Sequence, residues 1–236
     1  MNSNQNHLNL KAVESAATID VEEGYLELWT GPMFSGKTSK ILEIYKQFNF
    51  CGISTCVINY EEDNRYPNAE THLSTHDKTM IPCIRSKSMT EIVDIIGESG
   101  SNNISNNISG SNKISNKLSG KYVDKFLESK VILINEGQFF LDIVEWVKIA
   151  VDVYHKKVYI CGLDGDFERK SFNGDWLNLI PYCDKVKKLH SYCSNCKNKP
   201  AIFSHRLINE TAQKVIGVDS YVPLCRKCYL QLSLNN

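Results

Sequence analysis

The chain has no excess of charge of either sign, since its 236 residues include 27 basic and 27 acidic side chains. Proteins that coat a polyanion usually carry a clear basic excess, so the balance argues against a nucleic-acid-coating protein. A small phosphorylated ligand needs only a local cluster of positive charge and stays possible. We therefore expect no nucleic acid among the partners.

Long apolar runs are also lacking. No stretch approaches the roughly 20 apolar residues that are needed to span a bilayer. Residues 1–23 are polar and contain no apolar segment after a basic start, as a secretory signal would. We expect no membrane association and a cytoplasmic location, with the nucleus as the alternative. Because residues 1–23 show no apolar periodicity, they are predicted to form a disordered tail.

The residues that are present suffice for a folded core, since 42% of them are hydrophobic. The alternation in Tyr25–Trp29 predicts a strand, Ser39–Phe50 repeats apolar residues at helical spacing, and Ile53–Asn59 is rich in β-formers. This order is typical of a βαβ unit and predicts a mostly parallel sheet in an α/β fold.

Further along the chain, Val131–Ile134 and Val158–Leu163 are continuous apolar runs, as expected of strands that are buried on both faces. Ser88–Glu98 and Phe140–Val153 have helical patterns. Residues 99–121 consist almost entirely of Ser, Asn, Gly and Lys, and predict a low-complexity insert. We expect an inert insert there, with a partner-binding loop as the alternative.

The segment Gly31–Thr38 (GPMFSGKT) matches the phosphate-loop pattern G-x-x-x-x-G-K-[ST] in full. Such a loop, or P-loop, needs glycines so that backbone N–H groups can face phosphate oxygens, and the following helix adds its positive end. Lys37 is expected to reach the β- and γ-phosphates, and Thr38 to bind Mg²⁺. A chance match is the alternative, but the loop lies between a predicted strand and a predicted helix. The loop alone does not separate kinases from other nucleotide hydrolases.

The strand Val131–Ile134 ends in Asn135 and Glu136. P-loop enzymes usually have a carboxylate at such a strand end to organise Mg²⁺, and Asn135 occupies the position where Asp is expected. Glu136 is a candidate general base, because a strand end in the phosphate cleft brings it near an acceptor hydroxyl. The alternative is a surface carboxylate in a turn.

Nine cysteines are present. We interpret five scattered ones as small buried hydrophobes, namely Cys51, Cys56, Cys83, Cys161 and Cys183. The others form two Cys-x-x-Cys pairs, which predict a structural zinc site made by Cys193, Cys196, Cys225 and Cys228. Residues 197–224 form a longer spacer than the roughly 15 to 20 residues of common zinc sites. The alternatives are two disulfides, a nucleic-acid-binding zinc ribbon and a redox pair, the last of which is disfavoured because no βαβ pattern flanks either motif.

The chain resembles the type II, cytosolic-type thymidine kinase family in four features. These are the P-loop sequence GPMFSGKT, the segments EGQFF and LDGDFERKSF, and the two cysteine pairs, which occur in the same order as in that family. The resemblance covers about Gly24–Lys87 and Lys130–Tyr229. It implies a P-loop kinase domain over residues 24–190, followed by a zinc-binding domain over residues 191–236 that carries a long lasso loop.

The resemblance also implies residue roles. Glu136 would deprotonate the 5′-hydroxyl of thymidine, and deoxyuridine would also be accepted as a substrate. The nucleotide-binding set implied is Gly31, Pro32, Met33, Phe34, Ser35, Gly36, Lys37, Thr38, Asp63, Asn64, Arg65, Asn135, Gly137 and Gln138. The substrate-binding set implied is Met33, Phe139, Leu163, Phe167, Gln213, Lys214, Val215, Ile216, Gly217 and Tyr221.

By the same resemblance, ATP with Mg²⁺ and structural zinc are the expected cofactors. A homotetramer and feedback inhibition by thymidine triphosphate are also expected. Asn135 departs from the family's Asp and predicts weaker Mg²⁺ binding. A nucleotide-binding regulatory protein is the alternative function. Without the resemblance, Phe139 and Phe167 would be equally compatible with core packing and with base stacking.

Overall fold

The computed structural model describes residues 23–63, 71–74, 79–99, 118–214 and 220–233. A six-stranded sheet with the strand order β5-β2-β6-β7-β1-β8 forms its centre, and every neighbouring pair in it is parallel. The strands of this sheet are β1 (Tyr25–Thr30), β2 (Thr55–Tyr60), β5 (Ile84–Ser86), β6 (Val131–Ile134), β7 (Lys157–Gly162) and β8 (Lys185–Lys188). The predicted α/β fold with a parallel sheet is confirmed.

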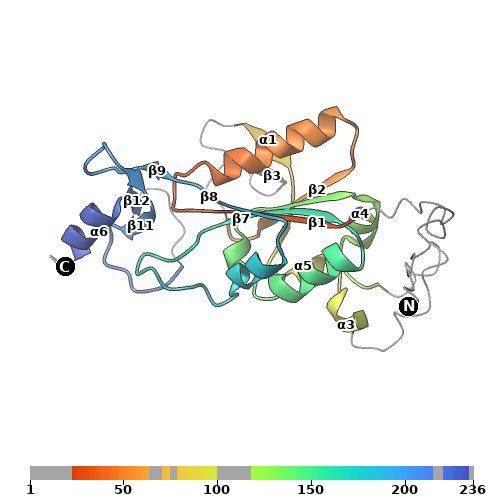
Figure 1. Cartoon of the computed structure of the whole chain (residues 1–236). Helices are drawn as coiled ribbons and strands as arrows, with labels where there is room; N and C mark the ends of the chain where they lie inside the picture. Colours follow the sequence, from red (N-terminus) through yellow and green to blue (C-terminus); the bar gives the residue numbers. More distant parts are fainter. Residues whose placement is uncertain (1–22, 64–70, 75–78, 100–117, 215–219, 234–236) are drawn as a thin grey trace, which may run out of the picture.

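Helices cover both faces of this sheet (Figure 1). Along β6, Val131 and Leu133 face the core that α1 (Lys37–Phe50) closes, whereas Ile132 and Ile134 face the core closed by α5 (Ile143–Asp152). Alternate side chains of a strand point to opposite faces, so an uninterrupted apolar run is what a sheet covered on both sides requires. On the α5 side lie also α2 (Met89–Ile92), α3 (Ile96–Ser99), α4 (Val123–Glu128), η3 (Gly137–Phe139) and η4 (Trp176–Tyr182).

The segment predicted as one helix, Ser88–Glu98, is two short helices in the structure, α2 and α3. Val93, between them, is extended, and its carbonyl accepts a hydrogen bond of 2.9 Å from the indole of Trp146. The N–H of Asp94 donates to the carbonyl of Ser119. Tertiary hydrogen bonds therefore override the helical pattern. The second predicted helix begins later than expected, at Ile143, after the short 3₁₀ helix η3.

The predicted insert 99–121 also ends earlier than its composition indicates. Leu118 is buried in the α5-side core, and Gly120 packs against the backbone of Ile92 and Val93. Residues 100–117 lie outside the described residues, as does the predicted tail apart from Glu23. Among the described cysteines outside the two pairs, Cys56 and Cys161 are buried as expected, but Cys51 is exposed, so that interpretation of Cys51 is wrong.

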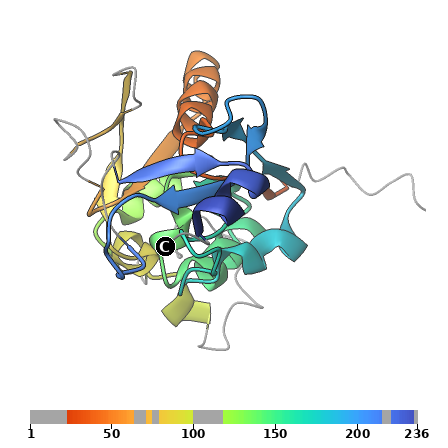
Figure 2. The same cartoon turned by 90° about the vertical axis from the view of Figure 1, so that its left-hand side faces the viewer.

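A small cysteine-rich unit lies beyond the sheet edge at which the P-loop sits (Figures 1 and 2). Its elements are β9 (Ser191–Tyr192), β10 (Pro200–Ala201), β11 (Phe203–Arg206), β12 (Tyr221–Leu224) and α6 (Arg226–Ser233). Strands β11 and β12 are antiparallel. The segment that joins them, residues 207–220, is called the lasso loop below, and its residues 215–219 lie outside the described residues. A separate hairpin is made by β3 (His72–Ser74) and β4 (Met80–Pro82). No described helix is long and apolar enough to cross a membrane.

Candidate active site

The P-loop connects the carboxyl end of β1 to the start of α1. Gly36 is left-handed, with φ 83°, and caps the first turn of α1. Gly31 has φ 151°, and a Cβ there would lie 2.5 Å from the carbonyl oxygen of Leu189. Both glycines of the pattern are therefore required by the backbone. Phe34 is exposed at the turn of the loop, so its side chain is not part of the core.

The two polar residues that end the P-loop pattern lie at the start of α1. The ammonium of Lys37 donates to the carbonyls of Gly31, at 3.1 Å, and Pro32, at 2.7 Å, which keeps this buried side chain against the loop. The hydroxyl of Thr38 donates to Oδ1 of Asn135 at 3.4 Å. The structure thus brings the P-loop and the end of β6 together, as the sequence predicts.

Asn135 uses both ends of its buried amide. Its Oδ1 also accepts from the thiol of Cys161 at 3.0 Å, and its Nδ2 donates to Oδ1 of Asn59 at 2.9 Å. Asn59 in turn donates to Asp63 at 3.3 Å. A chain of side chains therefore runs from the P-loop threonine to Asp63. Asn64 and Arg65, which the resemblance places beside Asp63, lie outside the described residues.

Glu136 follows Asn135 and is 8% exposed. Its backbone is left-handed, with φ 57°, an unusual conformation for a residue other than glycine. This conformation ends β6 sharply and starts η3. The alternative of an exposed turn carboxylate does not agree with this burial.

Gln138 joins Glu136 to the neighbouring strand. Its Nε2 donates to the Glu136 carboxylate at 2.7 Å, and its Oε1 accepts from the N–H of Leu163 at 3.0 Å. Gly162 allows this approach, because a Cβ there would lie 2.6 Å from Oε1 of Gln138. Gly137 is packed against Ile160 of β7. Gln138 thus orients the carboxylate of Glu136, a contact that the sequence pattern did not indicate.

Phe139, at the end of η3, lies among other aromatic rings. The ring of Phe139 is 5.2 Å from that of Tyr60 and 5.8 Å from that of Phe172. Lys214 of the lasso loop lies over Tyr60 and donates to its hydroxyl and to Glu62. Phe139 is only partly buried and therefore has both a packing face and an open face.

Three of the other predicted substrate residues, Phe167, Gln213 and Tyr221, lie where the lasso loop contacts the segment after β7. The guanidinium of Arg206 lies 3.8 Å from the ring of Phe167 and donates to the hydroxyl of Tyr221. The side chain of Gln213 donates to Asp166 at 2.8 Å and to the carbonyl of Ser171. Val215, Ile216 and Gly217 lie outside the described residues.

The P-loop also contacts the cysteine-rich unit. The N–H of Met33 donates to Oγ of the buried Ser204 at 3.0 Å.

Four polar residues of the site were not predicted from the sequence, namely Ser204, Arg206, Asp166 and Asn59. Asp166 lies within the segment LDGDFERKSF, which resembles the family, so its position in the sequence was a usable signal. The others carry no spacing signal, since their partners are distant in the sequence.

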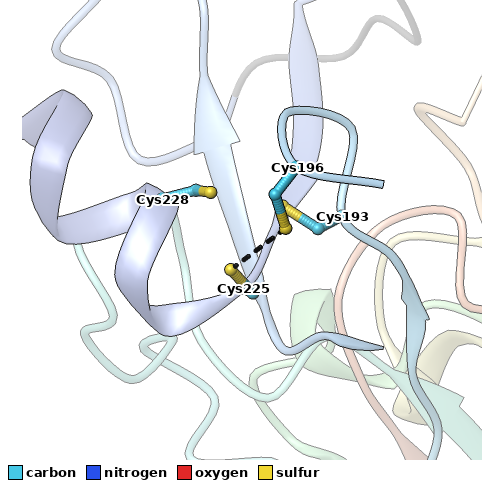
Figure 3. Close-up of side chains that lie close together, drawn as sticks. All are labelled: Cys193, Cys196, Cys225 and Cys228. Atoms are coloured by element: carbon cyan, nitrogen blue, oxygen red, sulfur yellow. Dashed lines mark hydrogen bonds between the residues drawn. The ribbon is translucent and has the colours of Figure 1, made fainter. Parts of the chain in front are cut away.

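The four paired cysteines converge on one point (Figure 3). Their sulfur atoms all lie within 4.8 Å of one another, and those of Cys196 and Cys225 are 3.8 Å apart. Tetrahedral zinc with Zn–S bonds of about 2.3 Å separates its sulfurs by about 3.8 Å. The thiols are free rather than paired as disulfides, so the residues fit zinc and not the disulfide alternative.

The surroundings of Cys193 favour a thiolate, the form that binds zinc. Burial alone raises the pKa of this thiol, but hydrogen bonds from the backbone N–H groups of Cys225, Cys196 and Asn195 lower it to about 6. Backbone donors that face a sulfur atom stabilise its negative charge. Burial and hydrogen bonds with the other three cysteines instead raise the pKa of the Cys228 thiol to about 11. The assignment of a closed, structural zinc site therefore rests on the convergence of four sulfur atoms, which can fill all four positions of a tetrahedral ion.

A phosphate loop between the buried strand β1 and helix α1, with a buried carboxylate at the end of β6, two strands away in the sheet, defines a P-loop phosphotransferase. Sequence comparison then identifies the type. The thymidine kinase family matches residues 24–108 and 100–229, and the chain belongs to this family. It is accordingly a thymidine kinase, an ATP-dependent phosphotransferase that acts on thymidine.

The chain is similar to curated thymidine kinases over nearly their whole length. The thymidine kinase of Sheeppox virus (strain KS-1) is 35% identical over 210 residues, which are 89% of this chain and 98% of that protein. That of Variola virus (isolate Human/India/Ind3/1967) is 34% identical over 208 residues, 88% of this chain and 97% of that protein. That of Myxoma virus (strain Uriarra) is 34% identical over 207 residues, 87% and 96% respectively.

Proposed function

We propose that Glu136 is the general base of this kinase and removes the proton of the thymidine 5′-hydroxyl while the γ-phosphate of ATP is transferred to that oxygen. The observation that carries the proposal is the position of its carboxylate. It is buried, it is oriented by Gln138, and it follows directly after the residue that contacts the P-loop threonine. A base must lie within hydrogen-bond reach of the proton that it takes.

The P-loop residues have separate tasks in this proposal. Lys37 neutralises charge on the β- and γ-phosphates, and the hydroxyl of Thr38 holds Mg²⁺. Because Thr38 donates its proton to Asn135, its oxygen lone pairs are available for the cation. Bound Mg²⁺ supplies positive charge to the phosphate oxygens. Asp63, Asn64 and Arg65 are proposed to contact the phosphates from the end of β2.

The nucleoside base is proposed to lie among Met33, Phe139, Leu163, Phe167 and Tyr221, with the lasso residues 213–217 over it. Support comes from the partly exposed Phe139 and from the contacts that Gln213 and Lys214 make with the kinase core. Backbone groups in such a loop can pair with the polar edge of thymine, and such pairing rejects bases that lack those groups. Deoxyuridine keeps that edge and should also be phosphorylated.

We also propose residues 24–190 as the kinase domain and residues 191–236 as the zinc domain. Support is the separation of the six-stranded sheet from the short strands that follow residue 190. Family membership supports a homotetramer, inhibition by thymidine triphosphate and a cytoplasmic location. Light scattering of the purified protein and turnover measured against added thymidine triphosphate test the first two.

The replacement Glu136→Gln tests the assignment of the base. The amide keeps the size of the side chain but accepts no proton, so we expect kcat to fall by at least about a hundredfold. The dissociation constant of thymidine, measured by calorimetry, should change little. Gln138→Glu is not a suitable control because it faces Glu136, and the exposed Glu145→Gln in α5 serves instead. Near-normal turnover of Glu136→Gln would refute the assignment.

A further inference from the structure

Arg206 closes the lasso loop at its base. It is the last residue of β11, and its partner in the antiparallel register is Tyr221, the first residue of β12. The side chain is 5% exposed although it carries a permanent charge. Residues 207–220, the lasso loop, begin and end at this pair.

The guanidinium of Arg206 binds the backbone of the loop that it closes. One terminal nitrogen donates to the carbonyls of Glu210 and Ala212, each at 2.6 Å, and the other donates to the carbonyl of Gln213 at 3.0 Å. Nε and the second terminal nitrogen donate to the hydroxyl of Tyr221. The carbonyls of Glu210, Ala212 and Gln213 therefore all point toward one guanidinium group. Only arginine offers several N–H donors in such a fixed, planar arrangement.

The flat face of the same guanidinium packs on the segment after β7. Its centre lies 3.8 Å from the ring centroid of Phe167, a close cation–π contact. Gln213, held at its carbonyl by Arg206, donates its side-chain amide to Asp166. Two segments that are distant in the sequence, 163–171 and 207–214, are thus joined through one side chain.

The chemistry of this site is unusual for a purely stabilising residue. Within the described residues the hydrogen-bond acceptors of Arg206 are neutral oxygens, namely three loop carbonyls and one phenol. A buried cation without a carboxylate partner has a high desolvation cost. An apolar side chain could close the hairpin, but it could not fix the direction of three carbonyl groups.

We propose that Arg206 is the positioning residue that sets the lasso loop and Phe167 in the arrangement that receives the nucleoside base. It acts through these groups and does not itself touch the reacting atoms. The inference rests on the proposed placement of thymidine under the lasso loop. The hydrogen bonds of Arg206 go to the lasso loop and to Tyr221, whereas the ammonium of the P-loop Lys37 binds the carbonyls of Gly31 and Pro32. We therefore expect the effect to fall on thymidine and not on ATP.

The test uses Arg206→Lys in the full-length, zinc-loaded protein. Lysine keeps the charge but offers one point of donation, so the three carbonyls and the Phe167 ring cannot all be held. We expect the KM of thymidine to rise at least about tenfold, which corresponds to about 1.4 kcal/mol, while the KM of ATP stays within about twofold. Thymidine should lose its stabilising effect on the melting temperature, whereas ATP should keep its own.

Arg226→Lys is the matched control. Arg226 is exposed at the start of α6, and its guanidinium also lies over an aromatic ring, that of Phe203. It should leave both KM values unchanged. Equal changes in both KM values, no change in either, or loss of bound zinc in Arg206→Lys would overturn the proposal. If the wild-type protein fails to phosphorylate thymidine, the proposed function fails instead, so the two failures are distinguishable.

Discussion

Asn135 is the residue at which this kinase departs from the carboxylate expected at the Mg²⁺ side of a P-loop. Its Oδ1 accepts from Thr38 and Cys161, and its Nδ2 donates to Asn59, which donates in turn to Asp63. A carboxylate at position 135 would face the Oδ1 of Asn59. Rotation of the Asn59 amide would relieve that contact but would turn its oxygen toward Asp63. The amide at 135 is therefore matched to its neighbours.

The replacement Asn135→Asp should have two opposed effects. The added negative charge beside Thr38 should lower the Mg²⁺ concentration needed for half-maximal rate. The lost donor to Asn59 should lower the free energy of unfolding by about 1–3 kcal/mol. Rate against Mg²⁺ and urea unfolding measure the two, with the exposed Asn178→Asp as control. Superimposable Mg²⁺ curves would show that Asn135 does not limit metal binding.

The individual residues that could be predicted from the sequence are those that belong to a local pattern. The P-loop, Asn135 and Glu136 follow one another along the chain, and their spacing defines their chemistry. Asn59 and Arg206 have no such spacing, because Asn59 meets Asn135 only across paired strands and Arg206 meets Phe167 only after the small unit has docked. Such partners become visible only in three dimensions.

The lasso loop also contacts the kinase core through the side chain of Lys214. Lys214 donates to Tyr60, at the end of β2, and to Glu62 just beyond it. The pair is partly exposed, with relative side-chain exposures of 29% for Lys214 and 48% for Glu62. Solvent screening therefore limits its strength. The contact therefore contributes a modest part of the free energy that holds Lys214 against the kinase core.

Loss of this attachment should weaken thymidine binding modestly. Lys214→Met and Glu62→Gln should each raise the KM of thymidine by about twofold to fivefold, in keeping with the 0.2–1 kcal/mol of a partly exposed pair. The double variant should be no worse than the more affected single variant, because both changes break one contact. Steady-state kinetics of the four proteins decide this, and strictly additive effects would argue against a shared contact.

Elements whose pattern agrees with their packing were predicted well. The run Val131–Ile134 is a strand with both faces covered. The segment Ser88–Glu98 was predicted wrongly, because the break at Val93 depends on Trp146 and on the distant Ser119. The strand Lys185–Lys188 was missed, since its side chains are exposed and show no apolar alternation.

At the scale of the whole molecule, the zinc site is linked to the substrate side. Tyr229 follows Cys228 in α6, and its hydroxyl donates to the carbonyl of Phe167 at 2.6 Å. Ser204, in the same unit, accepts from the N–H of Met33 in the P-loop. The order of strands in the sheet and these docking contacts could not be predicted, because each joins segments far apart in the chain.

Loss of zinc should therefore affect the nucleoside more than the nucleotide. Cys228→Ser should lower the zinc content and the melting temperature, and should raise the KM of thymidine at least about tenfold, with a smaller change for ATP. The exposed Cys51→Ser should retain zinc and activity. Metal analysis and kinetics on both variants test the link. Normal thymidine kinetics in a zinc-free protein would show that the zinc site does not affect thymidine binding.

The central claim is that this protein transfers the γ-phosphate of ATP to the 5′-hydroxyl of thymidine, with Glu136 as the general base. The most direct measurement follows labelled γ-phosphate from ATP, with Mg²⁺ and thymidine, in parallel for the wild-type protein and Glu136→Gln. We predict labelled thymidine monophosphate from the wild-type protein without any polynucleotide present, and almost none from the variant. ATP binding without transfer to thymidine, or equal transfer by both proteins, would contradict the account.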